Sequence, residues 1–297
     1  MTHAPIAGDR GFDHLVLCVR DLDAARAVYT RLGFTCTPRA EHSWGTANFL
    51  VQLQGDFLEV LTVSDPARLV APAPGEFSFG WFNAEFLEKR QGMSQLVFQS
   101  RDARADQAQL QSAGLDTYKP FDFERQAMLP DGSAARVAFS LAFVTHRAMP
   151  EASFFCCQHH APQYFWKPEY QRHANGALLA GDVVMRAPDP AAFAGFFGRL
   201  QGADAVAQAP GRLTVRTRLG TLVLLDSKAL AERLPEMNLP GPTDSPVFVA
   251  YRIAVDDIAA AEKLLRANDV AYRRHRGALI IDPIDAFGVA IEFAEAP

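Results

Sequence analysis

The amino-acid sequence predicts an α+β fold built from four copies of one βαβββ unit. The main observation is an internal repeat: residues 11–21 (GFDHLVLCVRD) are nearly repeated, without a gap, as residues 92–102 (GMSQLVFQSRD). Such a copy indicates a chain built from repeated supersecondary units. The second observation is that each copy continues in the same order, from an apolar run through a helix-like segment to three short strands.

The first unit shows how each element is predicted. Residues 12–19 are apolar and rich in branched side chains, which indicates a buried strand. Asp21 and Asp23 can cap a helix, and residues 24–32 carry helix formers up to Gly33, which favours a helix end. The three remaining strands of this unit are expected near residues 34–39, 45–53 and 57–63.

The same order of elements recurs three more times. The second unit is expected to have a strand at 93–100, a helix at 102–113 and strands near 120–127, 135–144 and 153–158. The third has a strand at 178–186, a helix at 189–200 and strands near 205–209, 212–218 and 221–226. The fourth has a strand at 247–255, a helix at 257–268 and strands near 270–275, 278–282 and 287–294. Longer inserts cover residues 64–91 and 158–177.

Composition limits the kinds of function. The chain has 297 residues, 49% of them hydrophobic and 21% charged, which predicts a folded globular protein. A net charge of -5 gives no reason to expect nucleic acid or an anionic membrane as partner, and no apolar run is long enough to span a bilayer. The N-terminus lacks a hydrophobic signal core, and four cysteines do not suggest a disulfide framework, so a cytoplasmic location is expected. The expected partner is a small molecule, and whether the chain forms a homodimer stays open.

The order of the units resembles the vicinal oxygen chelate superfamily. The resemblance is carried by Asp-His-Leu-Val (13–16) in the first strand and by Phe-Gly-Val-Ala-Ile-Glu-Phe (287–293) at the end of the last unit. That superfamily includes glyoxalase I, extradiol dioxygenases and fosfomycin- and bleomycin-resistance proteins, and the chain is most similar to its glyoxalase-like domain proteins. The resemblance implies that the units pair into two curled mixed β-sheets, each enclosing a cleft. It also implies a first domain at 1–160, a connecting loop at 161–176 and a second domain at 177–297.

The resemblance further implies where a divalent metal ion would bind. Ligands in this superfamily come from the first and last strands of the units, and in the first unit these positions correspond to His14 and Glu59. An imidazole and a carboxylate suit Fe, Mn, Ni or Zn. His159 or His160 could complete the set, and Gln95, which stands where the second unit would have a histidine, could bind substrate. The alternative is that His14 and Glu59 are hydrogen-bonded core residues.

The second half matches the pattern less well. Its third-unit position falls on Ala180 or Asp182, its fourth-unit position on Ala250, and only Glu292 keeps a ligand type. An extradiol dioxygenase that used this half would need two histidines beside the glutamate, and they are missing there.

The connector at 158–176 is unusually rich in functional side chains. It holds three histidines, four aromatic residues and two prolines, whereas connectors are usually plain and polar. We expect it to line or cover the cleft, with Trp166 as an apolar wall and His173 or Lys167 as polar contacts. The alternative is a crossover that packs its aromatic residues between the halves. Residues 76–82 are expected to wall the same cleft.

The leading functional prediction is a metal-dependent enzyme of glyoxalase-like type with lyase or isomerase chemistry. A divalent ion held by His14, Glu59 and either His159 or His160 would chelate adjacent oxygens of a small apolar or aromatic substrate, and Glu59 would also act as base. One alternative is a non-catalytic binding protein, like the drug-sequestering members of the superfamily, which Gln95 favours. Another is an extradiol-type ring-cleaving dioxygenase.

Overall fold

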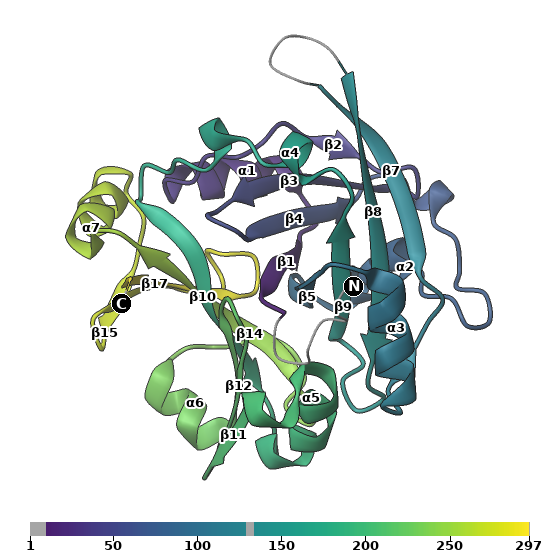
Figure 1. The fold of residues 1–297 in the computed structure, drawn as a ribbon. Helices are drawn as coiled ribbons and strands as arrows, with labels where there is room; N and C mark the ends of the chain where they lie inside the picture. The colour runs from purple at the N-terminus through teal and green to yellow at the C-terminus, as the bar shows by residue number, and fades with distance from the viewer. Residues whose placement is uncertain (1–9, 129–133, 297) are drawn as a thin grey trace.

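The computed structural model describes residues 10–128 and 134–296, which form two mixed β-sheets flanked by helices (Figure 1). Strands β1 to β9 make the first sheet and strands β10 to β17 make the second. Both sheets are open rather than closed into barrels. The predicted α+β class with two mixed sheets is therefore confirmed, whereas the predicted domain boundaries stay a prediction.

The first sheet is organised around two central strands that open the repeated units. Strands β1 and β5 pair antiparallel, and each pairs in parallel with the last strand of its own unit, β4 or β9. The strand order is β2-β3-β4-β1-β5-β9-β8-β6, and β7 pairs with β8 alone. The bounds are β1 Phe12–Cys18, β2 Ala40–Glu41, β3 Thr46–Gln52, β4 Phe57–Val63, β5 Gly92–Ser100, β6 Asp116–Thr117, β7 Phe121–Met128, β8 Ala134–Thr145 and β9 Ser153–His159.

The second sheet repeats this arrangement. Its central pair is β10 and β14, again antiparallel, with β13 and β17 parallel to them on either side. The strand order is β11-β12-β13-β10-β14-β17-β16-β15. The bounds are β10 Ala177–Arg186, β11 Val206–Ala209, β12 Arg212–Arg216, β13 Thr221–Leu225, β14 Val247–Val255, β15 Arg273–His275, β16 Ala278–Ile281 and β17 Ala290–Glu295.

The four predicted helices begin where the sequence places an aspartate cap. The carboxylates of Asp21, Asp102 and Asp257 accept hydrogen bonds from the first-turn backbone N–H groups of α1, α3 and α7, and Asp189 caps the 3-10 helix that leads into α5. These helices are α1 Leu22–Arg31, α3 Ala103–Ser112, α5 Ala194–Gln201 and α7 Ile258–Ala267, and the 3-10 helix is η3 Pro190–Phe193.

Within the described residues, three further α-helices lie in segments where we predicted no helix. Helix α2 forms inside the 64–91 insert, where the Ser78 hydroxyl accepts a hydrogen bond from the Trp81 N–H. Phe79, Phe86 and Leu87 are buried at helical spacing, a signal that the prediction for this insert did not use. The additional elements are α2 Phe79–Lys89, α4 Pro162–Phe165 and α6 Ser227–Arg233, with 3-10 helices η1 Pro66–Arg68, η2 Pro168–Tyr170 and η4 Ala203–Ala205.

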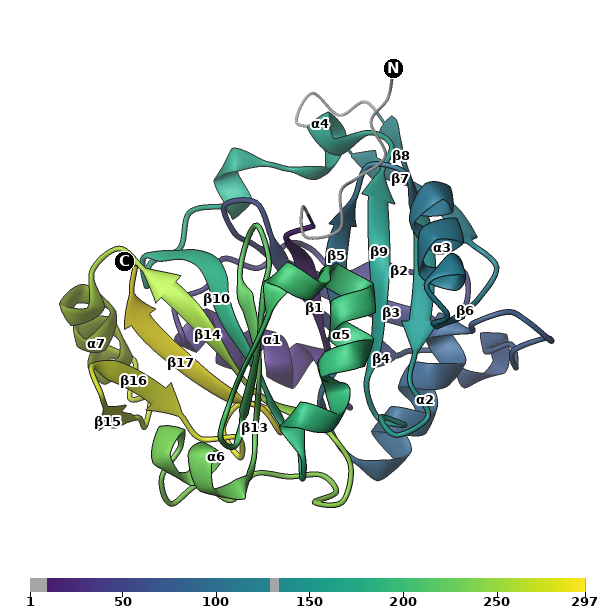
Figure 2. The same ribbon diagram turned by 60° about the horizontal axis from the view of Figure 1, so that its bottom comes forward.

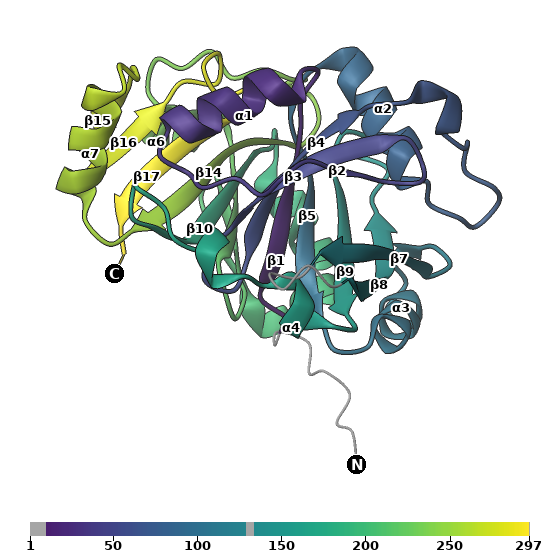
Figure 3. The ribbon, with the colours of Figure 1, turned by 90° about the horizontal axis from the view of Figure 1, so that it is seen from above.

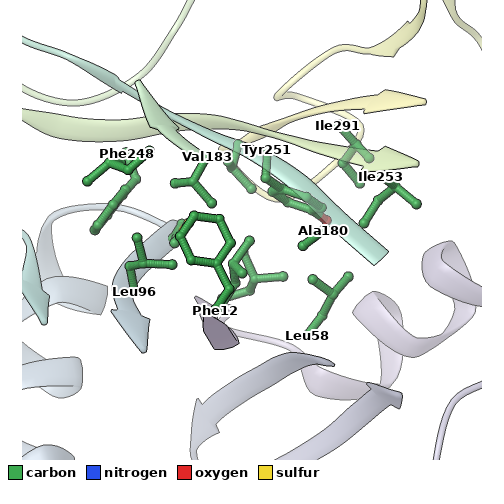
Figure 4. Packing of buried hydrophobic residues seen from close by; sticks show 14 of the residues in the cluster. Phe12, Leu58, Leu96, Ala180, Val183, Phe248, Tyr251, Ile253 and Ile291 are labelled. Carbon is green, nitrogen blue, oxygen red and sulfur yellow. The ribbon is translucent and has the colours of Figure 1, made fainter. Parts of the chain in front are cut away.

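The two sheets share one hydrophobic core. The halves lie side by side, and α1 spans the junction between them (Figures 2 and 3). Phe12, Leu58 and Leu96 from the first sheet face Val183 and Tyr251 from the second (Figure 4). Several of the largest fully buried side chains belong to this core, among them Phe12, Tyr29 and Tyr251.

At the junction, close packing requires a glycine at position 220, and two buried tyrosine hydroxyls form a hydrogen bond. Gly220 has a φ of +87°, and a Cβ there would lie 2.1 Å from the Phe12 ring, so only glycine fits. The buried hydroxyls of Tyr29, on α1, and Tyr251, on β14, are 2.9 Å apart and satisfy each other. These two contacts join the halves directly.

The outer, concave face of each sheet has a separate core. In the first half this face is covered by α2 and by Phe165 of α4, and in the second half by α6. The first-half face is where His14 and Glu59 lie. Within the described ranges, no helix is both long enough and apolar enough to cross a membrane.

Candidate active site

A cavity lies on the concave face of the first sheet, between β1, β4 and the β7–β8 hairpin. The cavity volume is about 50 Å³. A cavity needs roughly 10–15 Å³ to hold one water. The cavity therefore admits a few waters or a small ligand. Its polar lining is His14, His42, Asn48, Glu59, Arg125 and Cys157, and its aromatic lining is Trp44, Phe57, Phe79, Phe121, Phe123, Phe139, Phe155 and Phe165.

The structure brings His14 and Glu59 together in the wall of this cavity. Strands β1 and β4 pair in parallel, with His14 opposite Phe57 and Val16 opposite Glu59, so both side chains lie on the concave face. His14 Nε2 is 3.6 Å from Glu59 Oε2, and both residues are buried. This geometry is what the first- and last-strand positions of the unit predict.

A β-bulge at Asp13 orients the imidazole of His14. Adjacent strand residues normally point to opposite faces, but the register between β1 and β5 shifts between Phe12 and His14. Asp13 Oδ1 can thus lie 2.6 Å from His14 Nδ1. Burial alone would raise the pKa of Asp13, but His159 and His14 outweigh it and hold the pKa well below its usual value. An ionised Asp13 accepts the Nδ1 proton and leaves the Nε2 lone pair facing the cavity.

A second polar chain positions Glu59. The Asn48 amide donates to Glu59 Oε1 at 2.5 Å, which leaves Oε2 facing His14. His42 Nε2 lies 3.4 Å from the same amide, and the His42 ring stacks on Trp44 with centroids 4.6 Å apart. Burial lowers the pKa of His42, so its imidazole is neutral near pH 7.

The His14–Glu59 pair fits a bound cation. When its Nδ1 donates to Asp13, a neutral His14 would present Nε2 to the Glu59 carboxylate as a second acceptor, at 3.6 Å. That separation is too long for a hydrogen bond, and two facing acceptors gain stability from a proton or metal ion between them. An imidazole nitrogen and a carboxylate oxygen suit divalent transition metals. The residues present therefore fit an ion with two protein ligands and open positions for water or substrate.

The second unit supplies no matching ligands. The register places Gln95 and Phe155 at the positions equivalent to His14 and Glu59. Gln95 is fully buried, donates to Ser153 Oγ at 2.7 Å and accepts from Asn83 Nδ2 at 3.2 Å. Its amide is thus occupied inside the protein, and the structure does not bring it to the cavity, where we expected it to bind substrate.

His159 is the last residue of β9 and His160 follows it, and the two side chains go to different partners. His159 Nε2 lies 3.1 Å from Asp13 Oδ2, so His159 is linked to His14 through Asp13 rather than to Glu59. His160 is exposed and lies 2.8 Å from Ser140 Oγ, away from the cavity. The structure therefore does not bring either histidine to the His14–Glu59 pair as a third ligand.

Asp13 takes part in a second cluster of ligand-type side chains. Its carboxylate, the Cys157 thiol and the His159 imidazole have ligand atoms within 4.8 Å of one another. Burial, followed by the charges of Asp13 and Glu59, raises the pKa of Cys157 well above its usual value, so the thiol stays protonated without a metal. A thiol is a weaker ligand than a thiolate, which makes this cluster the less favourable metal site.

The connector packs along the first half. Trp166 stacks on His159 with centroids 6.2 Å apart and contacts Phe57, while its neighbour Phe165 lines the cavity. The apolar wall that we expected from Trp166 is thus supplied directly by Phe165, with Trp166 behind it. His173 accepts from the Thr35 N–H at 3.1 Å and donates to the Gln52 carbonyl at 2.8 Å. His173 therefore anchors the connector and is not at the cavity.

Because burial lowers its pKa, His173 should make stability depend on pH. The native imidazole stays neutral below pH 6.5, whereas the unfolded one takes up a proton, so stability is full above about pH 6.5 and falls as pH decreases. The loss is at most about 1.4 kcal/mol per pH unit for one proton. We expect His173→Asn to flatten the dependence of urea-unfolding stability between pH 7.5 and 5.5. An unchanged slope would show that His173 is protonated equally in both states.

In the second half, the last-strand carboxylate of the fourth unit, Glu292, is held by ion pairs. Glu292 is buried and accepts from Arg233 at 2.8 and 3.0 Å and from Arg252 at 2.7 and 3.0 Å. Arg233 also contacts Asp182, the residue equivalent to His14. Burial alone would raise the pKa of Glu292, but the two arginines lower it below its usual value. Because both of its carboxylate oxygens accept hydrogen bonds from arginines, Glu292 is not free to bind a metal ion.

Several site residues were not predicted from the sequence. Asp13 was missed because its orientation depends on the bulge, and His42 and Asn48 because they lie outside the first and last strands. Arg125 did have a signal: in Phe121–Arg125 apolar and charged residues alternate until an arginine takes an inward position, and exposure alternates in step.

Comparisons with known proteins agree on one fold. A family profile described as a glyoxalase-like domain matches residues 12–201. The structure resembles a hypothetical protein from Staphylococcus aureus, with a TM-score of 0.68, 14% identity, and coverage of 97% of this chain and 100% of that chain. It also resembles a mutant of 4-hydroxymandelate synthase from Streptomyces coelicolor (TM-score 0.58, 14% identity, 98% and 94% coverage).

A third solved structure adds a metal-bound example. The Mn(II)-bound glyoxalase from Novosphingobium aromaticivorans has a TM-score of 0.55 and 14% identity, with 97% of this chain and 82% of that chain covered. The search of curated proteins found no match. Identities this low show a shared fold and leave the reaction to be argued from the residues of the site.

Proposed function

Because the chain belongs to the glyoxalase-like domain family of the vicinal oxygen chelate superfamily, we propose that its first half is a metal-dependent enzyme. It would act by lyase- or isomerase-type chemistry on a small molecule with an apolar or aromatic body. The observation that carries the proposal is the 3.6 Å approach of His14 Nε2 and Glu59 Oε2 in the wall of an aromatic-lined cavity.

The roles of the residues follow from their contacts. His14 and Glu59 would hold a divalent ion, which as a Lewis acid stabilises negative charge on substrate oxygens. Asp13 fixes the His14 ring so that Nε2 faces the cavity. Asn48 holds Oε1 of Glu59 and leaves Oε2 facing His14, where this oxygen would be an ion ligand or, when not bound to the ion, a base for a substrate proton. The surrounding aromatic side chains exclude water from the reacting groups.

A binding protein without catalysis is the second candidate. It is favoured by Gln95 and Phe155, which occupy the two positions where the second unit would supply further ligands. A ring-cleaving dioxygenase of extradiol type has less support, because such iron sites use two histidines and one carboxylate. Among the described histidines, only His14 lies against Glu59, while His42 reaches it through Asn48.

Metal stoichiometry tests the proposal. We expect EDTA-treated protein to bind one equivalent of Mn²⁺ or Zn²⁺ per chain in equilibrium dialysis. One equivalent is expected, rather than two, because Arg233 and Arg252 occupy the Glu292 carboxylate in the second half. Absence of saturable binding would refute the metal-dependent proposal and favour the binding protein. Two equivalents would show that the ion pairs of Glu292 open.

A further inference from the structure

Arg125 projects from β7 into the cavity that holds His14 and Glu59. It follows Phe121 and Phe123 on the same face of the strand, and all three line the cavity, while Asp122 and Glu124 between them are exposed. This hairpin strand pairs with β8 alone, so its inward face is free to form one wall of the cavity. The strand thus places one cation among aromatic rings.

The guanidinium of Arg125 has no matching anion in the described part of the chain. Among residues 10–128 and 134–296, no side chain or carbonyl forms a hydrogen bond or ion pair with it. Glu59 is the carboxylate close enough to act on it, but the contacts of Glu59 go to His14 and Asn48. Arg125 is partly buried, and this burial lowers the pKa of its guanidinium. A half-buried arginine without a partner is costly unless something else supplies the anion.

Trp44 adds a second donor without an acceptor on the same wall. Its ring lies edge-on to Phe121 and Phe123, with centroids 5.4 and 5.0 Å away, and it lines the same cavity. Its indole N–H is buried and has no hydrogen-bond partner within the described part of the chain. Buried donors are normally paired, so an unpaired indole N–H in a cavity that Arg125 also lines indicates an acceptor that the described residues do not supply.

From these contacts we infer that Arg125, assisted by the Trp44 N–H, binds the carboxylate of the substrate. The ligand class is then a small organic acid with a flat apolar or aromatic body, its carboxylate on Arg125 and its body among the phenylalanine rings. Guanidinium and carboxylate groups form paired, charge-assisted hydrogen bonds, and this geometry is specific to arginine. The inference rests on the proposed use of this cavity as the ligand site, and it specifies the substrate class.

Paired probes separate the charge of the ligand from its shape. Benzoate and benzamide are nearly isosteric, and their dissociation constants can be measured by calorimetry on wild type, Arg125→Met and Arg125→Lys. The experiment uses EDTA-treated protein, because a bound metal could itself prefer the acid. Arg136 is the matched control, since it is exposed on the same hairpin and pairs with Glu124. Arg136→Gln removes one positive charge without altering the cavity.

We expect wild type and Arg136→Gln to bind benzoate at least tenfold more tightly than benzamide. In Arg125→Met that ratio should fall close to one with benzamide affinity retained, and Arg125→Lys should keep part of it. An equal affinity of wild type for both probes, failure of wild type to bind benzoate, or an undiminished ratio in Arg125→Met would each overturn the inference. The metal-dependent function fails separately, through the metal stoichiometry.

Discussion

Replacing His14 by alanine, or Glu59 by glutamine, is expected to weaken Mn²⁺ or Zn²⁺ binding by at least about a hundredfold. The reason is that each residue would supply one of two protein ligands, and changes even to groups that only orient a ligand cost about 10- to 100-fold. Asp13→Asn should fall in that smaller range, because it removes the acceptor that fixes His14. Equilibrium dialysis with circular dichroism on the same samples measures affinity and folding together.

Two control variants make this result specific. His160→Ala removes an exposed histidine of the same half that lies away from the cavity, so metal affinity should be unchanged. Cys157→Ala tests the neighbouring cluster of Asp13, Cys157 and His159. If Cys157→Ala abolishes binding while His14→Ala and Glu59→Gln leave it intact, the ion belongs to that cluster, and His14 and Glu59 are core residues.

Truncating Phe154 to alanine is expected to destabilise both halves together by about 3–5 kcal/mol. Phe154 belongs to β9 of the first half but packs against Phe197 and Phe248 of the second, with centroids 5.4 and 5.8 Å away. Because this ring lies in the shared core, its loss should shift one common unfolding transition. The three tryptophans, Trp44, Trp81 and Trp166, all precede the second half, whereas far-UV circular dichroism reports both halves.

Coincidence of the two signals decides whether the halves are coupled. The fluorescence and circular dichroism transitions should superimpose in wild type and in Phe154→Ala, as a single cooperative unit requires. Ile284→Ala is the control, because that side chain is 87% exposed and its removal should have little effect. Two separate transitions, with the fluorescence one unaffected by the variant, would show that each half folds independently.

Much of the fold could be predicted because its signals are local and repeated. The Asp-capped helices and the apolar strands follow from residues close in sequence, and four similar copies reinforce each other. Two of the missed helices carry local signals as well. Helix α6 is capped by Asp226 and α2 buries Phe79, Phe86 and Leu87 at helical spacing, but both lie outside the repeating pattern.

The candidate site was only partly predictable, because its details depend on long-range geometry. His14 and Glu59 could be placed from strand positions alone, and the structure sets them side by side. Which of His159 and His160 faces inward depends on the register of β9, which the sequence does not fix. The roles of Trp166 and His173 depend on how the connector packs against β3 and β4, and the Asp13 contact depends on a bulge.

Glu59 and Glu292 are both buried carboxylates, but they differ in the donors that surround them. Glu292 is satisfied by two arginines, so its surroundings have a single favoured arrangement. Glu59 is buried with one amide donor and faces another acceptor, which is a point of local frustration in the folded chain. Frustrated sites of this kind are retained where a protein must respond to something outside itself. The second half can therefore act as a rigid support, on which the first half tolerates an incompletely satisfied carboxylate.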